Sequence, residues 1–165
     1  MTRHKSILVG LSGALAALVA IFDLAGASAQ TPTRSPAVDP MSPVGIWTTI
    51  DDATGQPKSL IRIWEKGGKI YGTIVKLINP EDGDPNPPCD MCPGAMKDKP
   101  VLGMTIIKGL TKDGAEWSGG SILDPESGKT YKVYIEVLPG GKKLKVRGYI
   151  GFALLGRTQY WIRAR

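Results

Sequence analysis

Apolar and polar residues alternate along most of the chain after residue 43. Between residues 129 and 138, one face of the pattern carries Tyr131, Val133, Ile135 and Val137, and the opposite face carries Lys132 and Glu136. A period of two is typical of a half-buried β-strand, because successive side chains of a strand point to opposite faces of the sheet. We therefore predict that this part of the chain folds as strands, since helical spacing does not recur in it.

About eight segments of this kind follow one another along the chain. They span residues 45–50, 59–65, 69–78, 103–110, 116–124, 129–138, 142–150 and 157–164. In the segment 142–150, Leu144, Val146 and Ile150 share the apolar face. Turn signals such as Asp113-Gly114 separate the segments, so we expect neighbouring strands to pair as hairpins.

Eight consecutive antiparallel strands lose their free edges when the last strand pairs with the first. We therefore predict an all-β fold, an antiparallel up-and-down barrel of about eight strands. A two-sheet β-sandwich is the alternative.

A proline-rich segment interrupts the strands between residues 79 and 100. Its prolines are Pro80, Pro85, Pro87, Pro88, Pro93 and Pro100. Proline cannot donate to a sheet ladder, so this segment is not a central strand. Loops of about twenty residues are uncommon in compact domains and are usually functional or mobile. This one holds the only two cysteines of the chain, Cys89 and Cys92.

The C-x-x-C spacing of these cysteines has three interpretations. Zinc needs four ligands, so Asp84, Asp90 or Asp98 would have to complete a metal site. A redox dithiol needs a thiol of lowered pKa, as at a helix N-terminus, and the surrounding residues predict no helix. A disulfide would close a small ring and stabilise the loop by about 2 kcal/mol. We favour the disulfide and keep the redox and metal roles as alternatives.

The first 29 residues predict export. A short basic start precedes an apolar run from residue 6 to residue 22, and Ala27 and Ala29 supply the small residues that signal peptidase requires. Cleavage after Ala29 would deliver the chain to the periplasm or the medium, where a disulfide can persist. An uncleaved membrane anchor is the alternative.

The remaining chain divides into a leader and one domain. Residues 30–43 are rich in Pro, Ser and Thr and predict a disordered leader, and residues 44–165 predict a single β-barrel domain. Removing the signal peptide leaves 19 basic and 14 acidic residues, a net charge of +5. The basic residues alternate with apolar ones as on a solvated sheet face, so we expect no nucleic-acid partner.

The predicted mature chain lacks histidine, because the only one, His4, lies in the signal peptide. This removes the commonest general base and every Ser-His or Cys-His nucleophile pair. The paired acids Asp51 and Asp52 stand in a turn context, where aspartate bonds its own backbone. We therefore assign no catalytic residue, no cofactor and no metal, and we favour a non-enzymatic protein.

Five stretches are informative in combination: 45–77, the cysteine loop ending in KPVLGM, 119–137 with its DPESGK turn, 143–151 and 156–163. Together they resemble a bacterial domain-of-unknown-function family of small exported proteins with lipocalin-like barrels. The resemblance implies a lipocalin-like barrel and export, but no reaction. A more distant likeness to lipocalins rests on Gly45-x-Trp47 in the first strand and on Arg157 or Arg163 in the last. That likeness implies a tryptophan at the barrel base with an arginine packed across it.

Aromatic residues occur on nearly every predicted strand and suggest a ligand site. The candidate ligand-binding residues are Trp47, Trp64, Tyr71, Trp117, Tyr134, Tyr149, Trp161 and Arg163. Glycines within the same strands, such as Gly72, Gly120 and Gly148, would leave room for a ligand if they face inward. The alternative is that the aromatic side chains simply fill the barrel.

We expect a barrel that binds a small, partly hydrophobic molecule or a component of the cell envelope. One alternative is a structural or interaction module that contacts an envelope protein through the cysteine loop. A further alternative is a thiol-redox protein. We expect no stable membrane span after cleavage.

Overall fold

The computed structural model describes residues 39–78, 80 and 83–164. The predicted signal peptide, residues 1–29, and most of the predicted leader lie outside the described residues. The strands are β1 (Gly45–Ile50), β2 (Pro57–Lys66), β3 (Lys69–Leu77), β4 (Thr105–Asp113), β5 (Glu116–Asp124), β6 (Lys129–Val137), β7 (Lys143–Tyr149) and β8 (Gly156–Arg163). A short 3-10 helix, η2 (Gly94–Met96), lies in the connection between β3 and β4.

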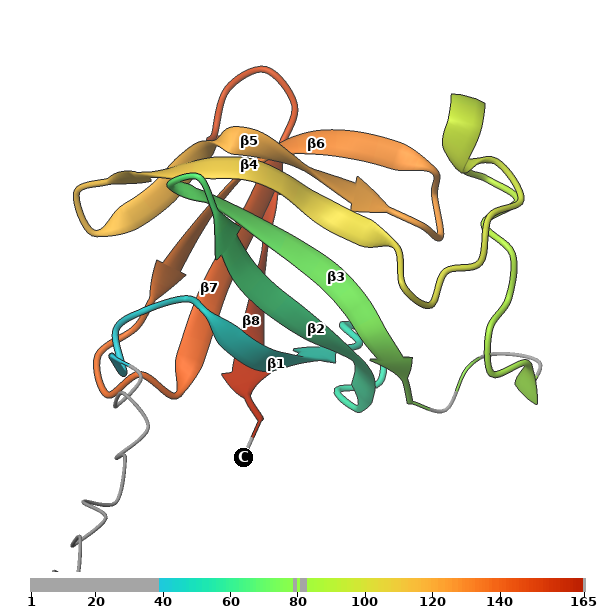
Figure 1. Cartoon of the computed structure of the whole chain (residues 1–165), viewed down its shortest axis with the longest axis horizontal. Helices are drawn as coiled ribbons and strands as arrows, with labels where there is room; N and C mark the ends of the chain where they lie inside the picture. The colour runs from blue at the N-terminus through green and yellow to red at the C-terminus, as the bar shows by residue number, and fades with distance from the viewer. Residues whose placement is uncertain (1–38, 79, 81–82, 165) are drawn as a thin grey trace, which may run out of the picture. The chain divides into compact units, whose positions relative to one another are not determined.

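The eight strands form one closed barrel, in which each strand pairs antiparallel with the next (Figure 1). The closing pair joins β1 to β8 through Trp47 opposite Arg163 and Thr48 opposite Ile162. Closure leaves no free sheet edge. The predicted up-and-down barrel is therefore confirmed, and the alternative of a two-sheet sandwich is wrong.

Strand positions follow the predicted alternation closely, with one instructive difference. The segment 142–150 was expected to carry Ile150 on its apolar face, but β7 ends at Tyr149 and Ile150 is exposed. Gly151 has a φ of 71°, which turns the chain away from the sheet directly after Ile150. Ile150 therefore belongs to the loop that connects β7 to β8.

One end of the barrel, which we call the base, is packed solid. Trp47, Ile63, Leu110, Ile135 and Leu144 are all almost completely buried there. They come from inward positions near the β2–β3, β4–β5 and β6–β7 turns. Gly72 belongs to the same packing, because a Cβ at this position would meet the side chain of Ile107 at 3.0 Å. In this half of the barrel Trp47 packs among aliphatic side chains, as the alternative interpretation of the aromatic residues expects.

The described end of the predicted leader, residues 39–43, lies against the base. Pro43 is fully buried, and its carbonyl oxygen accepts a 2.7 Å hydrogen bond from Nε1 of Trp47. The carbonyl oxygen of Pro40 lies so close to Gly141 that a Cβ there would approach it to 2.4 Å. Within the part of the chain that the structure describes, no helix is long and apolar enough to cross a membrane.

Candidate functional site

The end of the barrel opposite the base holds a pocket of about 1460 Å³. Its lining comes from the ends of β1, β3, β5 and β7, the starts of β2, β4, β6 and β8, and the proline-rich loop. Pockets for small molecules commonly measure roughly 300–1,000 Å³. The pocket is therefore large enough for a ligand with an extended body.

The inner wall of the pocket is apolar. It is formed by side chains of six strands, β2 to β7, namely Ile61, Ile74, Ile106, Ile122, Tyr131 and Val146. Trp161 lies deepest of the aromatic residues in the lining and is 2 % exposed. Gly148 adds space beside Tyr131, because a Cβ at this position would have no heavy atom nearer than 3.6 Å. A wall of this composition favours hydrocarbon over water.

Polar groups within the pocket are hydrogen-bonded to one another. The hydroxyl oxygens of Thr49 and Ser59 are 2.7 Å apart, and both residues are buried. Nε1 of Trp161 donates to Oε1 of Gln159 at 3.3 Å. No buried side-chain nitrogen or oxygen among the described residues lacks a partner. The buried polar groups of the wall are therefore paired and do not oppose the binding of an apolar ligand.

The rim of the pocket carries charge, beginning with a bridge between two hairpin loops. Lys58 on β2 pairs with Asp51 after β1, at 3.3 Å, and with Glu126 in the β5–β6 turn. Burial lowers the pKa of Lys58, but the hydrogen bonds and charges of Glu126 and Asp51 outweigh burial and raise it. Lys58 is therefore a fixed cation at the rim.

Asp51 and Asp52 have different partners, as their turn context predicts. Oδ1 of Asp51 accepts bonds from the backbone N–H of Thr54 at 2.8 Å and from the hydroxyl of Thr54 at 2.9 Å. These two bonds, together with Lys58, lower the pKa of Asp51 to about 2. Asp52 instead accepts from Arg157 and from Nε2 of Gln159 on β8. The two carboxylates therefore do not form an acid–base pair.

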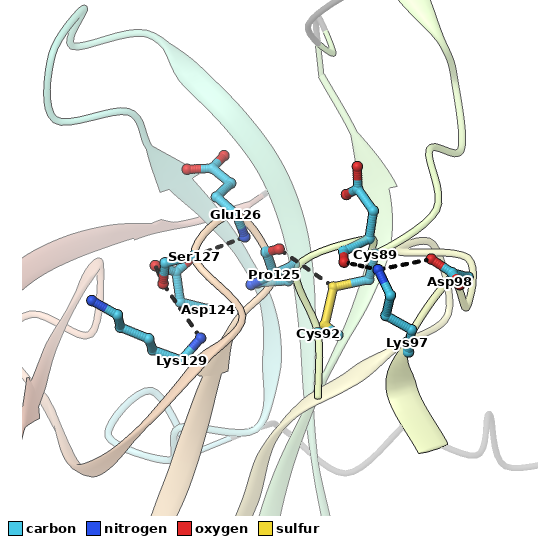
Figure 2. Close-up of a disulfide and its surroundings, with 10 residues drawn as sticks. Cys89, Cys92, Lys97, Asp98, Asp124, Pro125, Glu126, Ser127 and Lys129 are labelled. Atoms are coloured by element: carbon cyan, nitrogen blue, oxygen red, sulfur yellow. Dashed lines mark hydrogen bonds and ion pairs between the residues drawn. A yellow bond between two sulfur atoms is a disulfide. The ribbon is translucent and has the colours of Figure 1, made fainter. Parts of the chain in front are cut away.

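The cysteine loop lies beside this rim and is held by a disulfide between Cys89 and Cys92 (Figure 2). Sγ of Cys89 lies 3.3 Å from the carbonyl oxygen of Pro125 in the β5–β6 turn. A Cβ at Gly128 would collide with the carbonyl oxygen of Met91 at 1.7 Å, so the loop and the turn are in direct backbone contact. The favoured disulfide is confirmed.

Both cysteines are shielded from solvent. Cys89 is 1 % exposed and Cys92 is 2 % exposed. Thiol–disulfide exchange requires a thiolate to reach a sulfur atom. This burial favours a structural role for the disulfide over the redox alternative.

Comparison with known proteins places this barrel in a family. A family model described as "Uncharacterized protein conserved in bacteria (DUF2147)" matches residues 45–163, which include all eight strands. The chain belongs to the DUF2147 family. The search of functionally curated proteins found no match for this DUF2147 chain.

A solved structure shares the fold of the DUF2147 chain. It is a Helicobacter pylori protein, HP1028, which is described as belonging to the lipocalin family. The two are 21 % identical, with a TM-score of 0.66, and the match covers 76 % of this chain and 84 % of the other. The likeness establishes a lipocalin-like barrel, as the sequence resemblance implied.

The eight candidate ligand residues fall into three groups in the DUF2147 barrel. Tyr149 and Trp161 line the pocket. Trp47, Trp117 and Arg163 belong to the base. Trp64, Tyr71 and Tyr134 occupy positions that alternate with buried neighbours and thus lie on the outer face. Only the first group is carried into the proposed site.

The outer aromatic residues have their own partners. Trp64 and Tyr71 stack with ring centroids 4.7 Å apart, and Nε1 of Trp64 donates to the hydroxyl of Thr73 at 3.1 Å. Nζ of Lys145 lies 5.1 Å from the ring centroid of Tyr134. These cross-strand contacts stabilise the sheet from outside.

Sequence reasoning missed most of the pocket rim. Arg157, Gln159 and Trp161 alternate along β8 and share its inner face, so the period of two could have added the first two to the candidates. Tyr131 lies on the predicted apolar face of its strand and lines the pocket, but it is not among the candidate ligand residues. The pair of Lys58 and Glu126 joins positions 68 residues apart in different hairpins, and no local pattern signals it.

Proposed function

We propose that this DUF2147 protein is an exported, non-enzymatic barrel that binds a small molecule with an apolar body and a polar head. The main support is a barrel that is filled at its base and hollow at the opposite end. There, an apolar pocket of about 1460 Å³ is bordered by a charged rim. Export is supported by the signal-like sequence of residues 1–29 and by the disulfide, which persists in oxidising compartments.

The composition of the pocket suggests how the ligand is oriented. Its apolar body would lie against Ile61, Ile122 and Trp161, because burial there removes hydrocarbon from water. A chain of about sixteen carbons gains roughly 13 kcal/mol at about 0.8 kcal/mol per methylene. With an association cost of roughly 5 kcal/mol, a dissociation constant near one micromolar is expected.

The head of the ligand would remain at the rim, near Arg157. The side chain of Arg157 is 65 % exposed and is paired with Asp52. An exposed ion pair contributes little to stability, so a carboxylate or phosphate can replace Asp52 as the partner of the guanidinium. The rim would thereby select amphiphiles over plain hydrocarbons.

The test measures binding of a fluorescent fatty acid, the probe, by the wild-type protein and by a variant whose pocket is filled by a larger side chain. Gly148→Leu places a side chain in the space beside Tyr131, and the backbone of Gly148 is not in the left-handed region. Ser121→Leu adds a large apolar side chain on the outer face of β5, where Ser121 pairs with the exposed residues Lys108 and Lys132, and serves as the control. We expect wild type and Ser121→Leu to bind alike and Gly148→Leu to bind at least about tenfold more weakly.

Two results would contradict the proposal. Wild-type protein that does not bind the probe argues against an apolar site. Equal binding by Gly148→Leu, with the barrel still folded by circular dichroism, would place the probe elsewhere on the molecule.

A further inference from the structure

The loop between β7 and β8, residues 150–155, is the most apolar exposed segment that the structure describes. Ile150, Phe152, Leu154 and Leu155 are 63 %, 80 %, 90 % and 76 % exposed, more than any other large apolar side chain of the described residues. The loop contains no charged residue. Large apolar side chains that gather on a surface mark an interaction site.

Three carbonyl groups at the tip of this loop are hydrogen-bonded within the protein. The N–H of Leu155 donates to the carbonyl oxygen of Phe152 at 3.0 Å. Arg147 donates from Nε to the carbonyl oxygen of Ala153 at 2.8 Å and from a terminal nitrogen to that of Leu154 at 3.2 Å. These three consecutive carbonyl groups therefore need no water. Their pairing lowers the cost of bringing the tip to a lipid interface.

The loop is continuous with the pocket. Ile150, Leu154 and Leu155 belong to the pocket lining, whereas Phe152 does not. The loop projects beyond the strands at the top of the view in Figure 1. An apolar surface thus runs from the outside of the molecule to the inner wall at Val146 and Trp161.

The size and shape of the loop favour a lipid surface over a protein partner. A stable protein interface buries about 800 Å² on each side and needs roughly 20–30 residues. Six residues at a projecting tip cannot provide such an area, but insertion of a few apolar side chains is sufficient for interfacial membrane binding. The guanidinium of Arg147 lies against this loop, and its positive charge would attract the headgroups of anionic lipids.

We propose that the loop of residues 150–155 docks the protein on the surface of a lipid bilayer, with Phe152 and Leu154 inserted among the acyl chains. The mouth of the pocket then faces the bilayer, and the ligand is a single-chain lipid that passes between the two. The identity of this ligand rests on the proposed function, but the docking itself rests on the loop alone.

The test is flotation with vesicles of phosphatidylethanolamine and phosphatidylglycerol. The protein is used as the cell processes it, with its N-terminus defined by mass spectrometry. All variants share that N-terminus, so differences between variants report on the substituted side chain. Phe152→Ser and Leu154→Ser each remove one apolar group from the loop. Met91→Ser is the matched control, because Met91 is 62 % exposed but lies on the cysteine loop.

We expect wild type and Met91→Ser to float with the vesicles. Each loop substitution is expected to weaken vesicle binding by about tenfold, since each removes one apolar side chain that would be buried in the bilayer. Thermal unfolding of each variant checks that the barrel is intact.

Absence of vesicle binding by wild type, or unchanged binding by Phe152→Ser, would overturn the proposal. Equal loss in Met91→Ser would also overturn it, because binding would then not depend on this loop. A wild-type dimer that Phe152→Ser dissociates would show that a second copy covers the loop.

The same variants separate this inference from the proposed function. Phe152 does not line the pocket, so Phe152→Ser should keep its affinity for the fluorescent fatty acid. Vesicle binding that depends on Phe152, in a protein that does not bind the probe, would support docking and contradict the proposed function. Probe binding without dependence of flotation on Phe152 would support the function and contradict docking.

Discussion

The guanidinium carbon of Arg163 lies 4.2 Å from the ring centroid of Trp47, on the strand pair that closes the barrel. Arg163 also donates to the carbonyl oxygens of Gly141, Val44, Pro40 and Ser42. Burial lowers the pKa of Arg163, and the charge of Asp39 offsets part of this effect. The likeness to lipocalins left Arg157 or Arg163 as the partner of the tryptophan, and the structure assigns the contact to Arg163.

This contact should stabilise the base strongly. Arg163→Ala removes charge-assisted hydrogen bonds and the cation–π contact, so we expect the free energy of unfolding to fall by about 2–4 kcal/mol. Arg163→Lys keeps the charge but loses the planar fork and should lose about half as much. Urea unfolding measures both, with Arg62→Ala on the exposed face of β2 as control. A loss below about 0.5 kcal/mol in Arg163→Ala would contradict this account.

The disulfide should be structural and chemically shielded. We expect the double substitution of Cys89 and Cys92 by serine to lower the free energy of unfolding by about 2 kcal/mol without changing probe binding. Before reduction, neither cysteine should react with an alkylating agent in the folded protein. Rapid opening of the disulfide by a mild thiol under native conditions would instead support the redox alternative.

The low pKa of Asp51 predicts a specific acid response. Its pKa falls from 3.8 to about 2 in the folded protein, because Thr54 and Lys58 bind the ionised form. A carboxyl group whose pKa is lowered in the folded protein stabilises it at pH values above the pKa of the unfolded chain. This contribution to stability is lost as the pH falls from about 4 to about 2. Asp51→Asn lacks the carboxylate and therefore lacks this contribution at every pH. The difference in unfolding free energy between wild type and Asp51→Asn should therefore shrink over that range. A difference that stays constant from pH 5 to pH 2 would contradict the assignment.

Trp161 should report on the pocket through its fluorescence. It lines the pocket, whereas Trp64 lies on the outer face and is stacked with Tyr71. Saturation with an unlabelled fatty acid should change the emission of wild type and of Trp64→Phe. It should leave the emission of Trp161→Phe nearly unchanged. If the change instead disappears in Trp64→Phe, the ligand binds outside the barrel.

The strand pattern could be read from the sequence because burial on one side of a sheet imposes a period of two. The segments 45–50 and 116–124 match β1 and β5 at both ends. The predicted segment 103–110 begins two residues before β4, because Gly103 lies in a turn with a φ of 88° and the strand starts only at Thr105. Such conformations depend on the loop that precedes them.

The pocket could be predicted only in part, because alternation identifies the inner face but not the end of the barrel. Trp47 and Trp161 both face inward, yet one is packed in the base and the other lines the pocket. Register shifts between Leu60 and Ile61 and between Trp117 and Gly120 further separate sequence position from depth. Aromatic character alone does not distinguish the inner from the outer face of the sheet. The candidate ligand residues therefore include Trp64, Tyr71 and Tyr134, which lie on the outer face.

Native mass spectrometry tests the central claim most directly. Protein purified gently from the cells that produce it, without reductant, should carry an organic adduct in a one-to-one ratio, together with the mass deficit of one disulfide. Gly148→Leu, prepared in the same way, should show the disulfide but little or no adduct. A bare wild-type chain that also takes up no fatty acid on incubation would contradict the account and leave a barrel without a ligand.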